Sequence, residues 1–147
     1  MPVHGEYEPS SAGWVRDQVA EYEASRGSRA NTLRDTGLPV VIVTMRGQRS
    51  GKVRKIPVMR VEHGGQYAIV ASKGGTPENP GWYHNLVANP TEVMVQDGPE
   101  PFDVAVRELT GRERDEWWAR AVEAYPEYAT YQTRTSRVIP IFLATPV

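Results

Sequence analysis

Pro39-Val-Val-Ile-Val-Thr-Met45 decides the fold, because this stretch is apolar along most of its length and rich in β-branched side chains. Residues of that kind favour extended strands. Two more β-rich stretches follow, from Val53 to Glu62 and from Gln66 to Ser72, and Gly64-Gly65 marks a turn between them. Three consecutive strands joined by short links predict an antiparallel meander.

Beyond this meander the chain alternates short strands with short helices. Three more strands are predicted, at Glu92 to Gln96, Phe102 to Leu109 and Val138 to Leu143. Helices are predicted at about Ala12 to Arg26, at Trp82 to Val87, and from the capping-box pattern Thr110-Gly-Arg-Glu113 to about Ala124. About six strands with only short helices between them predict a mainly β, antiparallel barrel with flanking helices.

The composition limits what the chain can do. Lys and Arg number 17 and Asp and Glu 18, so the net charge of −1 gives no global attraction to nucleic acid or anionic membranes. The chain has no cysteine, and its histidines are far apart at His4, His63 and His84. The sequence therefore predicts neither a disulfide nor a metal site.

A length of 147 residues fits one domain, which we expect to contain an N-terminal helical segment (1–37) and a barrel (38–147). The N-terminus lacks the apolar core of a signal peptide, and the longest apolar run, Leu38 to Val43, is far shorter than a membrane span. We expect a cytoplasmic protein with at most peripheral membrane contact. For the N-terminal helix two interpretations stay open: packing on the barrel, or a lid or membrane contact.

The segment Arg46-Gly-Gln-Arg-Ser-Gly-Lys-Val-Arg-Lys55 carries five cations in ten residues, although the whole chain is nearly neutral. Glycine lets backbone N–H groups turn toward an anion, and arginine offers forked, charge-assisted hydrogen bonds to phosphate or carboxylate oxygens. The pattern predicts a hairpin tip that binds a phosphate-bearing ligand. The alternative is a tip that is merely solvated.

Two later stretches place polar groups beside the expected ligand. Ala71-Ser-Lys-Gly-Gly75 directly follows a predicted strand, so Ser72 and Lys73 lie at a strand end, where barrels commonly bind ligands. Trp82-Tyr-His-Asn-Leu86 combines large rings with polar tips. The alternatives are a plain turn for the first stretch and core packing for the second.

Tyr125, Tyr128 and Tyr131 are spaced three apart after a predicted helix. On one helical face they would form an aromatic strip that covers a flat ligand and offers phenolic donors. Ordinary packing at the mouth of the barrel is the alternative.

Taken together, five ordered motifs resemble the actinobacterial deazaflavin-dependent nitroreductase and quinone reductase family over about Pro39 to Pro146. They are Gly47-Gln-Arg-Ser-Gly-Lys-Val-Arg-Lys-Ile-Pro57, Ala71-Ser-Lys-Gly-Gly75, Asn79-Pro-Gly-Trp-Tyr-His-Asn-Leu86 with Ala88-Asn-Pro90, Tyr125-Pro-Glu-Tyr-Ala-Thr-Tyr-Gln132, and Ile139-Pro140. The resemblance implies a split β-barrel related to the FMN-binding barrels. It also implies coenzyme F420 and hydride transfer from F420H2 to a quinone, nitro or activated-alkene acceptor. Met59 departs from the nitroimidazole-activating member, which carries a tyrosine there.

By matching motif, the resemblance also implies the site residues. The cofactor-binding set is Gln48, Arg49, Ser50, Arg54, Lys55, Ile56, Pro57, Val58, Met59, Val70, Ala71, Ser72, Lys73, Gly81, Trp82, Tyr83, His84, Asn85 and Tyr128. Within it, Arg49, Arg54 and Lys73 would hold the phosphate and polyglutamate tail. The catalytic set, which would orient the acceptor and supply a proton, is Ser72, Tyr125, Tyr128 and Tyr131.

Two alternatives remain. A barrel of this kind binds FMN or haem in place of the deazaflavin, or the chain is a non-catalytic module whose basic hairpin binds nucleic acid or a protein partner. The near-neutral charge disfavours nucleic acid. The expected partner is a small-molecule acceptor, namely a quinone, a nitroaromatic compound or an unsaturated lactone, and the sequence does not predict the oligomeric state.

Overall fold

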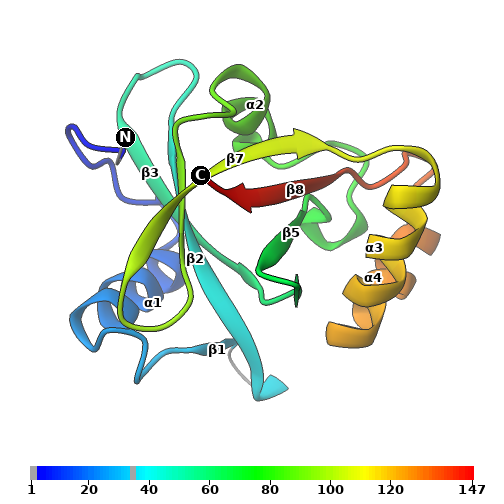
Figure 1. Ribbon diagram of the computed structural model, residues 1–147, viewed down its shortest axis with the longest axis horizontal. Helices are drawn as coiled ribbons and strands as arrows, with labels where there is room; N and C mark the ends of the chain where they lie inside the picture. The colour runs from blue at the N-terminus through cyan, green and yellow to red at the C-terminus, as the bar shows by residue number, and fades with distance from the viewer. Residues whose placement is uncertain (1–2, 34–35) are drawn as a thin grey trace.

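The computed structural model describes residues 3–33 and 36–147 and contains one curled sheet with helices around it (Figure 1). The strands are β1 (Thr32–Leu33), β2 (Leu38–Arg46), β3 (Val53–Met59), β4 (Glu62–His63), β5 (Gln66–Val70), β6 (Val93–Gln96), β7 (Pro101–Glu108) and β8 (Ile141–Pro146). The helices are α1 (Gly13–Ala24), α2 (Gly81–Ala88), α3 (Gly111–Ala124) and α4 (Glu127–Thr133), with a 3-10 turn, η2, at Lys73–Gly75. Across the described residues, none of these helices has the length and apolar character that a membrane crossing needs.

The strands pair in the order β1-β2-β6-β7-β8-β5-β4, and β3 pairs with β2 outside this series. All of these pairings are antiparallel. Residues 40–46 of β2 pair with β3, and residues 42–45 pair with β6. Because the sheet curls until β3 contacts β5, it forms the predicted split β-barrel. The six predicted strands are confirmed, and the two short strands β1 and β4 are additional.

Strand β2 is apolar from Leu38 to Val43 and again at Met45, because both of its faces are buried from Val40 onward to Met45. Val40 and Ile42 belong to one core cluster, and Val41, Val43 and Met45 belong to the other. Successive strand residues point to opposite faces, so a strand between two clusters has no polar face. Each fully buried side chain of this kind stabilises the fold by about 1.5–3 kcal/mol. The stretch that predicted the meander is therefore the strand that separates the two clusters.

Helix α1 is anchored to the sheet at its C-terminal end. The buried Tyr22 hydroxyl donates to the Gln96 carbonyl at 3.2 Å and accepts from the Gly98 N–H at 2.8 Å. Gly27 has a φ of +81°, and a Cβ added there would lie 2.7 Å from the Gly98 Cα. The end of α1 is thus packed directly on the turn between β6 and β7.

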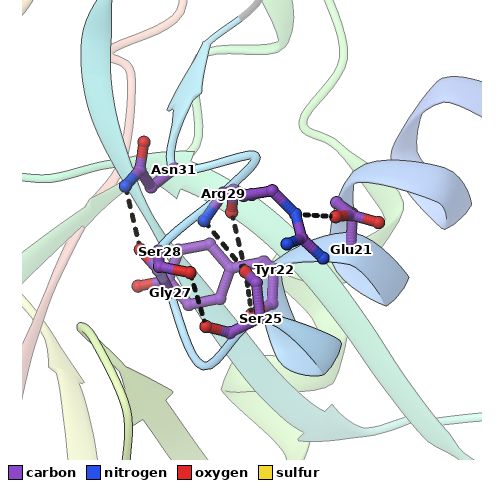
Figure 2. Close-up of polar contacts among 7 residues, drawn as sticks. All are labelled: Glu21, Tyr22, Ser25, Gly27, Ser28, Arg29 and Asn31. Carbon is purple, nitrogen blue, oxygen red and sulfur yellow. Dashed lines mark hydrogen bonds and ion pairs between the residues drawn. The ribbon is translucent and has the colours of Figure 1, made fainter.

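The turn after α1 is braced by its own polar side chains (Figure 2). The Ser25 hydroxyl accepts from the Arg29 N–H at 2.9 Å, and the Ser28 hydroxyl donates to the Ser25 carbonyl at 2.8 Å. The Asn31 amide donates to the Gly27 carbonyl at 2.8 Å. These bonds satisfy backbone groups that the end of a helix leaves without partners.

Strand β8 begins at Ile141 rather than at the predicted Val138. The Pro140 carbonyl still accepts from the Ala71 N–H at 2.9 Å, but proline has no N–H to return the bond, and the Ile139 N–H donates to Gln132 Oε1 of α4 at 3.1 Å. Similarly, β3 ends at Met59, earlier than predicted.

Helix α3 begins where predicted but without the predicted capping box. Thr110 is the N-cap residue, yet its side chain makes no capping hydrogen bond. Glu113 instead accepts two hydrogen bonds from Arg107 of β7, at 2.8 and 2.6 Å. Glu113 is therefore hydrogen-bonded to Arg107 of the preceding strand instead of to the N-cap residue Thr110, as the capping-box motif predicts.

Candidate active site

The hairpin between β2 and β3 is less positive than its sequence suggests, because four of its five cations pair with carboxylates. The pairs are Arg46 with Glu92 at 2.9 Å, Lys52 with Glu6 at 2.8 Å, Arg54 with Glu8 at 3.2 Å, and Lys55 with Glu23 at 2.6 Å. Arg49, at the exposed tip, forms no ion pair with any residue that the structure describes.

Two of these carboxylates come from an N-terminal segment that lies along β3. The Glu8 N–H donates to the Val53 carbonyl at 2.9 Å, and the Val53 N–H donates to the Glu6 carbonyl at 2.8 Å. Because side chains alternate along extended backbone, Glu6 and Glu8 face the same side, toward Lys52 and Arg54. The segment therefore supplies a matched pair of negative charges.

A cavity of about 800 Å³ lies beside the hairpin tip, and we call it the polar cavity. It is lined by Glu8, Ser10, Gly47, Gln48, Arg49, Ser50, Arg54, Ile56, Gly81, Trp82, His84 and Asn85. The Gln48 N–H donates to Asn85 Oδ1 at 2.9 Å, which ties the hairpin tip to α2. Gly81 begins α2, and the first N–H groups of a helix favour anions. This end of the site suits a ligand with negative charge.

A second cavity of about 640 Å³, the apolar cavity, lies farther along β3. Its lining comprises Ser10, Trp14, Val15, Leu33, Thr36, Val40, Ile56, Pro57, Val58, Met59, Val70, Ser72, Lys73, Gly74, Pro80, Trp82, Tyr125, Tyr128 and Tyr131. Strands β2 and β3 contribute to its wall, and so do α1 and α4, which lie at the left and at the right of the view in Figure 1. Ser10, Ile56 and Trp82 line both cavities, so the two adjoin.

The three predicted tyrosines form one cluster at the end of the apolar cavity. The hydroxyls of Tyr125 and Tyr131 are hydrogen-bonded to each other at 2.9 Å. The rings of Tyr125 and Tyr128 meet edge to face at 5.0 Å. Burial, together with the hydrogen bond to Tyr131, raises the pKa of Tyr125 to about 12. Burial also raises the pKa of Tyr128, with further contributions from its two neighbours. Tyr125 and Tyr128 therefore keep their protons at neutral pH.

The structure brings most of the predicted site residues to these two cavities. Of the cofactor-binding set, 16 line one or both: Gln48, Arg49, Ser50, Arg54, Ile56, Pro57, Val58, Met59, Val70, Ser72, Lys73, Gly81, Trp82, His84, Asn85 and Tyr128. All four predicted catalytic residues line the apolar cavity.

Three predicted residues lie elsewhere. Lys55 pairs with Glu23 of α1 and lines a separate cavity of about 360 Å³. Ala71 is fully buried at the end of β5. The Tyr83 hydroxyl donates to Glu108 Oε1 at 2.9 Å, and its ring packs against Phe142.

Several cavity residues lie outside the predicted set, chiefly Glu8, Ser10, Trp14 and Val15 of the N-terminal part. Their places depend on how that part folds back over β3. For Glu8 the sequence does contain a signal: acidic residues two apart at Glu6 and Glu8 match cations two apart at Lys52 and Arg54.

The chain is similar to known proteins over most of its length. The family model of the F420H(2)-dependent quinone reductases matches residues 14–146. An F420H(2)-dependent quinone reductase of Mycobacterium tuberculosis is 38% identical over 112 residues, which cover 73% of this chain and 73% of that protein.

Three solved structures are also similar to this chain. An F420-H2 dependent reductase is 57% identical, with a TM-score of 0.68 over 72% of this chain and 93% of that one. A domain-swapped dimer is 50% identical, with a TM-score of 0.72 over 92% of this chain and 99% of that one. A heme storage protein from Vibrio cholerae is 13% identical with a TM-score of 0.56, over 90% of each chain, and this likeness shows the shared fold alone.

Proposed function

The chain belongs to the F420H(2)-dependent quinone reductase family, and from this premise we propose that its two adjoining cavities bind the cofactor and the acceptor. The protein is an oxidoreductase, and coenzyme F420 is its cofactor. Its reaction is hydride transfer to a quinone. The observation that carries the site assignment is the pairing of a polar, arginine-bearing cavity with an apolar, tyrosine-lined one.

The two cavities suit an elongated ligand with a flat ring at one end and an anionic tail at the other. Each has a volume typical of ligand sites, at about 800 and 640 Å³. Arg49 and Ser50 at the hairpin tip, with the start of α2, would hold the tail. Arg54 also lines the polar cavity, but its guanidinium already forms an ion pair with Glu8. The charge-assisted bonds of arginine to phosphate suit this role.

The ring would lie against β3, where Ile56 to Met59 form the wall of the apolar cavity. Trp82 lines both cavities and would mark the junction between ring and tail. Ser72, whose hydroxyl has no hydrogen-bond partner among the described residues, would donate to the ring or to the acceptor. Contacts of this kind, which are largely apolar, would exclude water from the reacting groups.

When bound in its reduced form, the deazaflavin supplies a hydride. The tasks left to the chain are to hold the acceptor at near-attack distance and to provide a proton. Tyr125 and Tyr128 remain protonated at neutral pH because burial raises the pKa of both. Each is therefore able to donate a hydrogen bond to an acceptor oxygen that gains negative charge.

We propose that nitro compounds and activated alkenes, such as unsaturated lactones, react at the same place. Hydride transfer requires only that the acceptor be flat and electron-poor. The apolar cavity offers phenolic donors at one end and large apolar side chains, Trp14 and Met59, along its wall. Such a lining selects for shape and hydrogen-bond acceptors rather than for one chemical group.

The test is a titration of the purified protein with F420 and, separately, with FMN, followed by absorbance and fluorescence. We expect F420 to bind in preference to FMN, and F420H2 to be consumed when a quinone is added. Tight FMN binding without measurable F420 affinity would contradict the assignment. Strongly salt-dependent binding of an oligonucleotide would instead support the non-catalytic alternative.

A further inference from the structure

Arg137, which lies between α4 and β8, is hydrogen-bonded to the segment that joins β5 to α2. Its guanidinium donates to four oxygens: the carbonyls of Ala71 at 3.2 Å, Ser72 at 2.7 Å and Thr76 at 2.8 Å, and Asn79 Oδ1 at 2.8 Å. This segment carries Ser72 and Lys73 into the wall of the apolar cavity. The Arg137 side chain is therefore hydrogen-bonded to residues at both ends of the segment between β5 and α2.

The segment adopts a conformation that needs support. Lys73, Gly74 and Gly75 have successive φ angles of +45°, +64° and +80°. Lysine rarely adopts a left-handed backbone, and such outliers persist where surrounding contacts fix them. Arg137 bonds the carbonyls on both sides of these three residues, at Ser72 and Thr76. The planar fork of a guanidinium matches this spread of acceptors in a way that the single point of an ammonium does not.

Arg137 also contacts the tyrosine helix. Its carbonyl accepts from Gln132 Nε2 at 2.8 Å, and Gln132 Oε1 accepts from the Ile139 N–H at 3.1 Å. The same helix packs on the segment, since a Cβ added at Gly75 would lie 2.4 Å from the Tyr131 carbonyl oxygen. The positions of Ser72 and Tyr131 are therefore coupled through Arg137 and Gly75.

The surroundings of Arg137 indicate that its side chain fixes the position of the segment and does not serve to place a positive charge there. All four acceptors of its guanidinium are neutral oxygens, and it forms no ion pair with a carboxylate among residues 3–33 and 36–147. Partial burial lowers its pKa, so the cation is held at some cost in solvation. A residue that served only to place a positive charge would not need four N–H donors directed at four backbone and amide oxygens.

We propose that Arg137 is a positioning residue of the active site, which fixes Ser72 and Lys73 against the tyrosine cluster so that acceptor and cofactor meet in a reactive geometry. The proposal rests on the proposed function, because it assigns the acceptor to the apolar cavity. Arg137 lines neither the polar nor the apolar cavity, so it acts through the segment that it holds.

The test compares Arg137→Lys and Arg137→Ala with a matched control, Arg114→Ala. Arg114 is also partly buried with a lowered pKa, and it donates to the Ile139 carbonyl at 2.6 Å, but it does not bond the 71–79 segment. We expect both Arg137 variants to lose about a hundred-fold in kcat with a water-soluble naphthoquinone, a loss of the size that a misplacement near 1 Å can cause. F420 affinity should fall much less, because the polar cavity is untouched. Arg114→Ala should keep the wild-type kcat.

A second readout does not depend on activity. Trypsin cleavage after Lys73, followed by mass spectrometry, should accelerate in both Arg137 variants and not in Arg114→Ala. Millimolar guanidinium chloride should slow this cleavage and restore part of the kcat of Arg137→Ala, whereas sodium chloride at equal ionic strength should not.

Retention of wild-type kcat and cleavage rate in Arg137→Lys would overturn the proposal. So would an equal loss of kcat in Arg114→Ala at matched thermal stability, because that result would show a general effect of weakened packing. If the wild-type protein did not bind F420, the proposed function would fail, while cleavage after Lys73 and its reversal by guanidinium would still decide whether Arg137 holds the segment.

Discussion

At the scale of single residues, the hydrogen bond between the Tyr125 and Tyr131 hydroxyls makes these two side chains one functional unit. Removing one donor to developing negative charge in a dry site costs about 2.7–4 kcal/mol. We expect Tyr125→Phe and Tyr131→Phe each to lower kcat, and the double variant to lose little more than the worse single variant. Thermal stability should change little, because phenylalanine keeps each ring in place. Steady-state kinetics of the four proteins would measure the coupling.

Tyr128→Phe is the matched control, because the Tyr128 hydroxyl has no hydrogen bond to Tyr125 or Tyr131. Combined with Tyr125→Phe, its effect on kcat should be close to additive. Additive losses for Tyr125 and Tyr131 would show that the two hydroxyls act separately. A large fall in stability with normal turnover would show that all three tyrosines are core residues.

A sequence motif does not determine which of its residues line the cavities, because that depends on contacts with residues outside the motif. Arg54 and Lys55 are neighbours in the basic hairpin, yet Arg54 lines the polar cavity and Lys55 pairs with Glu23 of α1. Their side chains point to opposite faces of β3, and only the position of α1 decides which face is covered. Tyr83 similarly bonds to Glu108 of β7, far away in the sequence. The motif residues were predictable as a group, whereas their individual directions were not.

At the scale of elements, the N-terminal segment and the basic hairpin form one electrostatic unit. Glu8 pairs with Arg54 inside the polar cavity, and Arg49 is the hairpin cation without an ion pair among the described residues. We expect Arg49→Ala to weaken F420 binding by about 1.5–3 kcal/mol, roughly ten- to a hundred-fold. Glu8→Gln should tighten binding by at most about 1 kcal/mol, because its pair is partly exposed and must be exchanged for the anionic tail.

Fluorescence titrations at two salt concentrations would measure both effects. Glu92→Gln is the control, since Glu92 neutralises Arg46 outside either cavity. Weaker F420 binding in Glu8→Gln would mean that this carboxylate supports the site instead of competing with the tail. Equal affinity in wild type and Arg49→Ala would mean that the hairpin tip is merely solvated.

Element boundaries were predictable where local chemistry decides them and not where distant partners do. Helix α3 starts at the Thr110 to Glu113 pattern, but Glu113 bonds to Arg107 and no capping box forms. Strand β8 starts late because Pro140 has no N–H to return the bond that its carbonyl accepts from Ala71, and the Ile139 N–H donates to Gln132 Oε1 of α4. For Glu113 and for Ile139, a partner outside the local pattern takes the hydrogen bond.

At the scale of the whole molecule, the fold class was predictable from the hydrophobic pattern of the sequence. Strand β2 lies between two core clusters, so its sequence is a nearly continuous apolar, β-branched run that is typical of a buried strand. The closure of the sheet depends on the long-range pairings of β8 with β5 and β7, which sequence periodicity does not encode. The division into an N-terminal segment (1–37) and a barrel (38–147) stays a prediction. So do the site roles, until cofactor binding is measured.

Buried tyrosines make the stability of the whole molecule sensitive to alkali. The chain has seven tyrosines, and burial raises the pKa of Tyr67 and of Tyr125 to about 12, with hydrogen bonds to Asp97 and Tyr131 adding to the two shifts. An unfolded tyrosine has a pKa of about 10. Above that pH the unfolded chain releases protons that the folded chain keeps, so the free energy of unfolding falls as pH rises.

The raised pKa values of Tyr67 and Tyr125 therefore contribute stability that is fully present below about pH 10 and is lost as the pH rises through about 12. We expect urea denaturation midpoints to be constant from about pH 8 to 9.5 and to fall steeply above about pH 10, together with the ultraviolet absorbance change of phenolate formation. Tyr67→Phe should be less stable than wild type near pH 8, because it loses the 2.6 Å hydrogen bond to Asp97. That deficit should shrink as the pH rises, since phenylalanine cannot ionise. If all seven tyrosines ionised together near pH 10 while the protein stayed folded, the tyrosine cluster would be open to water, and its assignment as a set of protonated donors in a dry cavity would be wrong.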